Sequence, residues 1–103
     1  MYGLIGKINV APGQRHAVVE ALLDGADAMP GCLSYVVAED PADADAIWVT
    51  EVWDSKESHA NSLALPAVQA AIRRARPHIT GFGAHVETAP VGGHGLAGAR
   101  SAT

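Results

Sequence analysis

The sequence predicts a single α+β domain with the element order β-α-β-β-α-β. Four runs of alternating or β-branched residues have the pattern of strands, and two stretches of helical periodicity separate the first run from the second and the third from the fourth. The two halves are similar in length, about forty residues each. At 103 residues the chain has the usual size of one domain.

The first half of the chain predicts two strands on either side of a helix. Residues 2–10 alternate between two sets of side chains, which is typical of a strand. Over residues 14–29, apolar side chains recur every third or fourth position, which indicates an amphipathic helix. Pro30 and Gly31 should end this helix, and residues 32–38 then alternate again as a second strand.

Residues 47–53 are the most strand-like run in the chain because they are rich in β-branched and aromatic side chains. An acidic turn over residues 39–45 precedes them, so a hairpin with the second strand is expected. Successive side chains of a strand point to opposite faces. One face therefore carries Ile47, Val49, Glu51 and Trp53, and the other carries Trp48, Thr50 and Val52. Both faces are largely apolar, so we expect both to be covered.

A helix should begin directly after this strand. Asp54 lies three residues before Glu57, which is the spacing of a capping box, and this predicts a helix start at about Ser55. Helical character runs to residue 63 and resumes after Pro66, which suits a first helical turn.

A fourth strand over residues 79–87 completes the split βαβ pattern, with Phe82, Ala84 and Val86 expected on one face. This is the ferredoxin-like arrangement, an antiparallel sheet with both helices on one side. A dimeric α+β barrel, in which two sheets pack face to face, would cover the second apolar face. We therefore predict a domain over residues 1–88, a homodimer, and a flexible Gly- and Ala-rich tail over residues 89–103.

Composition excludes several classes of partner. Apolar residues make up 49% of the chain and charged residues 17%, which is high apolar content for a small monomer. The net charge of −4 and the sparse basic residues argue against nucleic acid. No apolar run is long enough to span a bilayer and no signal segment is visible, so we expect a cytoplasmic protein without a membrane partner. Cys32 is the single cysteine, which suits a reducing compartment and a small apolar filler rather than a nucleophile.

Two further sequence patterns do not indicate a cofactor or metal site. The run from Gly93 to Gly98 matches G-x-G-x-x-G, but no helix can follow it, so it is not a nucleotide loop. The five histidines show no spacing of three or four residues and no cysteine partner, so no metal site is expected.

Polar and aromatic groups converge at one place only. Glu51 and Trp53 share the inward face of the third strand, and His59 follows one turn into the next helix. Each also has an ordinary interpretation: Trp53 as core, His59 as an exposed helical residue, and Glu51 as the partner of a neighbouring cation such as Lys7.

Four segments carry a family resemblance. The A-P-G after the first strand, P-G-C-L-S-Y, T-E-V-W-D-S-K-E and L-P-A-V-Q resemble the antibiotic biosynthesis monooxygenase (ABM) domain family of dimeric α+β barrels. The similarity extends over residues 1 to about 88. That family includes small oxygenases that act on quinols and polycyclic anthrones without flavin or metal, and a haem-degrading branch.

The resemblance implies specific residues for each branch. In the cofactor-free anthrone oxygenases it implies a Trp matching Trp53, an aromatic hydroxyl at the position of His59 and an Asn at the position of Val49. The Trp is kept, His59 can still exchange a proton, and Val49 cannot form a hydrogen bond. The Asn, Trp and His of the haem-degrading branch would fall at or near Gly6, Ser62 and Ile72, so none is present.

The resulting hypothesis is a cofactor-independent monooxygenase that uses O2 to oxidise a quinol or an anthrone-like polycyclic aromatic. His59 and Trp53 are the candidate catalytic residues, with His59 as proton acceptor and Trp53 as aromatic wall. Tyr35, Val49, Glu51 and Trp53 are the candidate substrate contacts. The alternative is a binding or isomerase-type barrel without oxygenase activity, since fold does not determine chemistry. A purely structural dimer would have no pocket.

Overall fold

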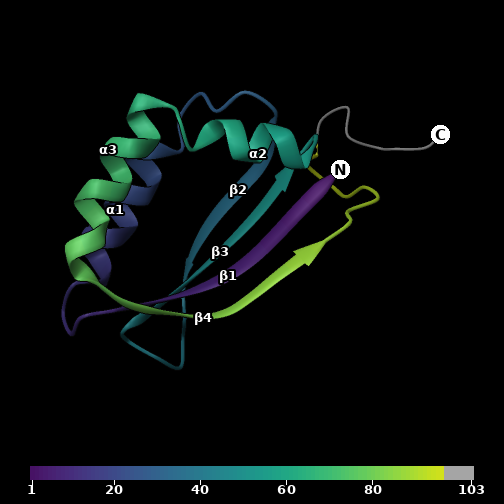
Figure 1. Cartoon of the computed structure of the whole chain (residues 1–103). Helices are drawn as coiled ribbons and strands as arrows, with labels where there is room; N and C mark the ends of the chain where they lie inside the picture. The colour runs from purple at the N-terminus through teal and green to yellow at the C-terminus, as the bar shows by residue number, and fades with distance from the viewer. Residues whose placement is uncertain (97–103) are drawn as a thin grey trace.

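The structure, a computed structural model, describes residues 1–96 and contains one four-stranded sheet with its helices on one side (Figure 1). The elements in chain order are β1 (Tyr2–Val10), α1 (Arg15–Gly25), β2 (Cys32–Glu39), β3 (Ala46–Trp53), α2 (Lys56–Ser62), α3 (Pro66–Ala75), a 3-10 turn η1 (Arg76–His78) and β4 (Ile79–Thr88).

The sheet has the strand order β2-β3-β1-β4, and every neighbouring pair is antiparallel. This order places the two halves of the chain around the central pair β1 and β3, which confirms the predicted ferredoxin-like fold. Figure 1 shows α1 and α3 side by side at one end of the sheet, and α2 across its other end. Gly25 permits the close approach of α1 and α3, because a Cβ there would lie 2.5 Å from the Cβ of Ala71.

The two sheet faces differ as the alternation of β3 predicts. The largest fully buried side chains are Trp53 and Ile47 of β3 and Val18 of α1, which covers that face of the sheet. On the opposite face, Ile5 is 36% exposed and Val36 is 52% exposed. The open face thus remains apolar and uncovered in the single chain.

Strand β4 departs from the expected alternation. Its register against β1 shifts between Gly6 and Ile8, so that Phe82 pairs with Ile8 on the helix side while Val86 pairs with Ile5 on the open side. A bulge of this kind moves the following side chains to the other face. The prediction that Phe82 and Val86 share one face is therefore wrong.

Helix α2 is capped one residue later than the sequence suggested. Ser55, not Asp54, is the N-cap, and its Oγ accepts a hydrogen bond from the backbone N–H of Ser58 at 3.1 Å. The backbone N–H of Asp54 instead donates to the carbonyl of Gly31 at 2.9 Å. Asp54 is thus held by the turn that precedes β2, and the capping-box assignment to Asp54 is wrong.

Replacing Ser55 with alanine should lower the free energy of unfolding by about 1 kcal/mol, because the N-cap hydroxyl is lost. Asp54→Ala is the matched control and should cost less, because it leaves this hydrogen bond intact. Chemical denaturation of both variants measures the difference. A larger loss for Asp54→Ala would restore Asp54 as the cap.

Helix α1 ends at Gly25, earlier than the expected residue 29. Ala28 has a positive φ of 52° and Gly31 one of 83°, so the chain turns back before β2 begins. The backbone N–H of Cys32 donates to the carbonyl of Met29 at 3.1 Å and closes this turn. The apolar periodicity of the sequence continues past the end of the helix. Periodicity indicates which side chains share a face, but it does not show that the backbone turns before Pro30.

No helix within residues 1–96 is long and apolar enough to cross a membrane. Of the predicted tail, residues 89–96 are described, and a Cβ at Gly3 would lie 2.9 Å from Cγ of Pro90. The tail therefore leaves the domain alongside the start of β1. Residues 97–103 lie outside the described residues, and the predicted flexibility stays a prediction.

Candidate functional site

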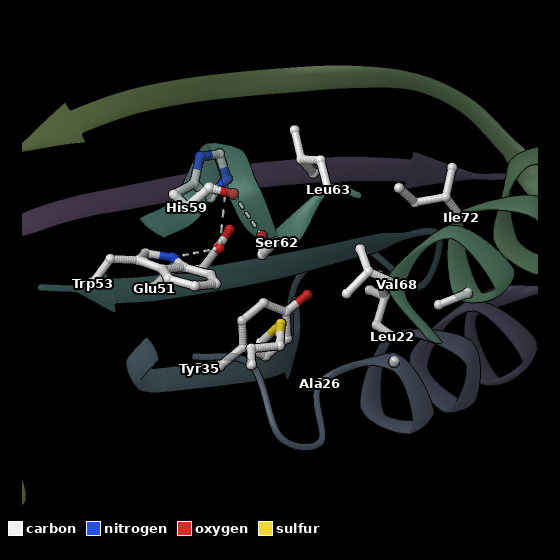
Figure 2. A pocket seen from close by; sticks show the side chains of 13 residues that line it. Leu22, Ala26, Tyr35, Glu51, Trp53, His59, Ser62, Leu63, Val68 and Ile72 are labelled. Carbon is white, nitrogen blue, oxygen red and sulfur yellow. Dashed lines mark hydrogen bonds and ion pairs between the residues drawn. The ribbon is translucent and has the colours of Figure 1, made fainter. Parts of the chain in front are cut away.

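A cavity of about 140 Å³, here called the inner cavity, lies between the sheet and the helices (Figure 2). Its polar lining comes from the sheet and from α2: Tyr35 on β2, Glu51 and Trp53 on β3, and His59 on α2. Its apolar lining comes mainly from α1 and α3, including Leu22, Ala26, Val68 and Ile72. The structure thus brings together four of the five candidate site residues.

Glu51 is the centre of this group. Its Oε1 accepts a hydrogen bond from Nε1 of Trp53 at 3.0 Å. The same Oε1 lies 3.9 Å from Nε2 of His59, and Figure 2 shows both partners converging on it. The side chains of His59 and Glu51 are only 23% and 17% exposed. The carboxylate therefore has one fixed donor and one titratable neighbour in a largely dry position.

The imidazole of His59 lies between two aromatic rings. The ring of Trp53 meets it edge-on at a centroid distance of 5.4 Å, and the ring of Tyr2 lies 5.7 Å away. Ser62 donates a hydrogen bond from Oγ to the backbone carbonyl of His59 at 2.6 Å. Packing and helix geometry therefore restrict the imidazole to the neighbourhood of Glu51.

Tyr2 is itself anchored at the surface of the site. Its hydroxyl donates to Oε2 of Glu87 at 2.6 Å, and Nζ of Lys56 lies 3.4 Å from the same oxygen. The hydrogen bond to Glu87 raises the pKa of Tyr2 to about 12 and lowers the pKa of Glu87. The phenol that packs against His59 is therefore neutral near neutral pH.

Tyr35 contributes a second neutral hydroxyl. It pairs with Glu51 across the β2–β3 ladder and lines the inner cavity. Burial raises the pKa of Tyr35 well above its ordinary value, and the charge of Glu51 adds to the increase. Tyr35 therefore keeps its proton and can donate a hydrogen bond to a ligand oxygen.

A second hollow, the outer cavity, adjoins the inner one and has a volume of about 450 Å³. Glu51, Tyr35 and Leu22 line both, so they form the wall between them. Val49, the fifth candidate residue, lines the outer cavity and not the inner one. The inner cavity has about the volume of one that admits benzene, roughly 150 Å³. A fused aromatic system would need the outer cavity.

The ordinary interpretation of Glu51 as the partner of Lys7 is wrong. Lys7 belongs to the alternate face of β1 and pairs with Trp48 across the ladder, whereas Glu51 pairs with Leu4. Nζ of Lys7 lies 4.0 Å from Oδ2 of Asp43 and 5.9 Å from the ring centroid of Trp48. Strand alternation separates the two side chains, and Glu51 keeps the partners that face the cavity.

Cys32 fits the interpretation as a packing residue. Its Sγ lies 3.6 Å from the carbonyl oxygen of Ser34, and burial raises the pKa of its thiol. A raised pKa lowers the thiolate fraction and with it the nucleophilicity. In residues 1–96, no group of three or more His, Cys, Asp or Glu side chains is arranged to hold a metal ion.

Sequence reasoning did not identify His85, which lines the outer cavity together with Phe82 and Ala84. The expected alternation put Phe82, Ala84 and Val86 on one face and so left His85 on the other, apart from Phe82. The β-bulge in β4 changes this, and His85 pairs with Gly6 on the helix-covered face. The available signal was the pairing of His85 with Gly6, which has no side chain. This pairing can be recognised only once the register of β1 against β4 is known.

Fold and site together define an α+β protein of the ferredoxin-like class, with an apolar hollow under its helices and a carboxylate and an imidazole on the wall of that hollow. The family model for antibiotic biosynthesis monooxygenase (ABM) matches residues 1–74. The chain belongs to this family.

Solved structures agree with that assignment. A protein from Chloroflexus aurantiacus J-10-fl, assigned as an antibiotic biosynthesis monooxygenase, is 63% identical, with a TM-score of 0.90 over 92% of this chain and 97% of that chain. One from Deinococcus radiodurans with the same assignment is 26% identical, with a TM-score of 0.73 over 87% and 92% of the two chains. A third, from Nitrosomonas europaea, is 14% identical with a TM-score of 0.78 over 88% and 99%, and shows the fold alone. Among curated proteins no significant match was found.

Proposed function

We propose that this protein is a cofactor-independent monooxygenase that oxidises a quinol or an anthrone-like polycyclic aromatic with O2. The observation that carries the proposal is the placement of Glu51 and His59. A largely buried carboxylate and imidazole lie within 3.9 Å of each other on the wall of an apolar hollow. This is the arrangement that a base needs to remove a proton from a weakly acidic hydroxyl in a dry site.

The electron balance of the reaction requires no further reductant. A quinol or anthrone loses two hydrogen atoms and gains one oxygen atom, while the second oxygen atom of O2 leaves as water. All four electrons that reduce O2 come from the substrate. The protein then has to bind the ring, remove the hydroxyl proton and keep water away from the anion that reacts with O2.

The position of each residue in the two cavities suggests which of these tasks it performs. Glu51 faces both cavities and, with His59 beside it, accepts the hydroxyl proton. Trp53 donates to Glu51 and so fixes the orientation of the carboxylate. Tyr35, protonated at all working pH values, donates to a ligand oxygen, and Val49 supplies apolar wall in the outer cavity.

Oxygen consumption tests the proposal directly. The purified protein is mixed with 1,4-dihydroxynaphthalene or anthrone in air-saturated buffer without added metal or flavin, and O2 uptake is followed with an electrode. We expect uptake above the spontaneous rate and incorporation of one ¹⁸O atom per product molecule. Binding without uptake would instead favour the alternative, a small-molecule-binding or isomerase-type protein.

The apolar open face of the sheet leads us to propose a homodimer. Val36 is 52% exposed, Val86 49% and Ile5 36%, and all three lie on strands of this face. Extended apolar patches are uncommon on stable monomers. We expect sedimentation velocity to show a dimer at micromolar concentration.

A paired substitution distinguishes this dimer from nonspecific association. Val36→Lys should shift the protein to the monomer, because it puts a charge on the apolar face that the dimer would bury. Leu23→Lys, at a residue of α1 that is 53% exposed, is the matched control and should leave the dimer intact. Equal dissociation by both, or a monomeric parent protein, would contradict the proposal.

We also expect no tight haem binding, because the residues that the haem-degrading branch would require are not available. Gly6, Ser62 and Ile72 carry no side-chain nitrogen, and Ser62 and Ile72 instead line the inner cavity. A haem titration should therefore give no saturable Soret shift at one equivalent. A stoichiometric shift would overturn this expectation.

A further inference from the structure

The imidazole of His85 is solvent-exposed and lies next to Gly6. His85 on β4 pairs with Gly6 on β1, and Gly6 pairs in turn with Val49 on β3. A Cβ at Gly6 would lie 3.7 Å from Cδ2 of His85, which is an ordinary contact distance, so the ring lies beside this position of β1. From there it lines the outer cavity together with Glu51 and Tyr35.

Glu51 and His85 approach this cavity from opposite sides of β1. Glu51 pairs with Leu4 and His85 pairs with Gly6, so the two residues lie on the strands that flank β1 and are offset by two positions. Ordinary sheet spacing then puts their Cα atoms about 12 Å apart. Both side chains line the outer cavity, so a ligand in it can lie between them.

The lining between these two polar groups is apolar. Ile8, Leu22, Val49 and Phe82 contribute to it, and Phe82 is 73% exposed at the mouth of the cavity. Lys7 is also a lining residue, but its side chain lies on the other face of β1, where its ammonium group is close to Asp43 and to the ring of Trp48. A flat ring with a polar atom at each end fits this distribution of groups better than a ring with one polar atom.

We infer that His85 is a specificity residue that hydrogen-bonds the second oxygen of the aromatic ligand, opposite the oxygen that Glu51 receives. The outer cavity then selects quinols and polycyclic rings with two opposed oxygens over simple phenols. This inference rests on the proposed function, since it concerns the same ligand and the same carboxylate. It adds to that function the residue that binds the second oxygen of the ring.

Anaerobic binding measurements test the inference without turnover. Tryptophan fluorescence is titrated with 1,4-dihydroxynaphthalene, which has two opposed oxygens, and with 1-naphthol, which has one. For His85→Ala we expect the Kd of the diol to rise about three- to tenfold, the loss of one hydrogen bond, and the Kd of 1-naphthol to stay within about twofold. His85→Asn, which keeps a donor, should recover part of the diol affinity.

Two matched controls separate this role from a general loss of structure. His16→Ala removes an exposed histidine of α1 that pairs with Glu20, and should change neither Kd. Gly6→Val adds a branched side chain against the His85 ring, which should displace the ring and reproduce His85→Ala. Gly81→Val, on β4, is the control for it. A Cβ at Gly81 meets nothing within 4 Å, so this variant should not change the Kd of the diol.

The possible outcomes are distinct. Equal losses for diol and naphthol, no loss for either, or no binding of either probe by the parent protein would overturn the role of His85. A diol-specific loss supports it whether or not O2 is consumed. Absence of O2 uptake with a bound diol would overturn only the proposed oxygenation.

Discussion

Replacing His59 with alanine is expected to lower kcat for a quinol substrate by about 10² to 10⁴, the usual contribution of a positioned acid or base. The reason is the position of the imidazole, 3.9 Å from Oε1 of Glu51 and only 23% exposed. Without it, Glu51 must take and release the proton alone. Steady-state O2 uptake under saturating quinol measures the loss.

Controls separate proton transfer from other effects. His16→Ala, at a histidine that is 81% exposed, should keep the parent kcat. Glu51→Gln should lower kcat at least as much as His59→Ala, because the amide is nearly isosteric but accepts no proton. Since the two residues act on one proton, the double variant should be little worse than the poorer single variant. A His59→Ala protein with unchanged kcat would remove the imidazole from the mechanism.

Replacing Trp53 with alanine is expected to destabilise the fold by about 3 to 5 kcal/mol, the range for large aromatic residues removed from a core. Trp53 is 1% exposed and is among the largest fully buried side chains. Its loss also leaves the largely buried Glu51 without its indole donor. For a domain of this size the expected fall in Tm is about 12 °C or more.

Two further variants show which part of the indole matters. Trp53→Phe keeps most of the buried area but not the donor, so it should cost less stability while still reducing kcat. Trp48→Ala removes the other tryptophan, which is only partly buried on the open face, and should cost less than Trp53→Ala. All melts are compared at one protein concentration, because any dimer makes Tm concentration-dependent. Equal Tm values for Trp53→Ala and the parent protein would exclude Trp53 from the core.

Local sequence patterns determined the order, type and approximate bounds of the elements. The period-2 alternation of β1 and the β-branched run of β3 predicted both strands, and Pro66 predicted the start of α3, because these signals depend on steric preferences within a few residues. The convergence of Glu51, Trp53 and His59 was also predictable. Strand alternation and one helical turn are both local geometry, and they place the three side chains at the same edge.

Only the tertiary structure decided how that edge becomes a site. The separation of Glu51 from Lys7 depends on the pairing of β1 with β3, and Asp54 is held by a hydrogen bond to Gly31, which lies far away in the sequence. His85 lines the outer cavity because a bulge in β4 places it on the same sheet face as Phe82 and Glu51. Register between strands is set by the pairing of whole elements, so a shift of one residue moves a side chain to the other face without any change in its local sequence pattern.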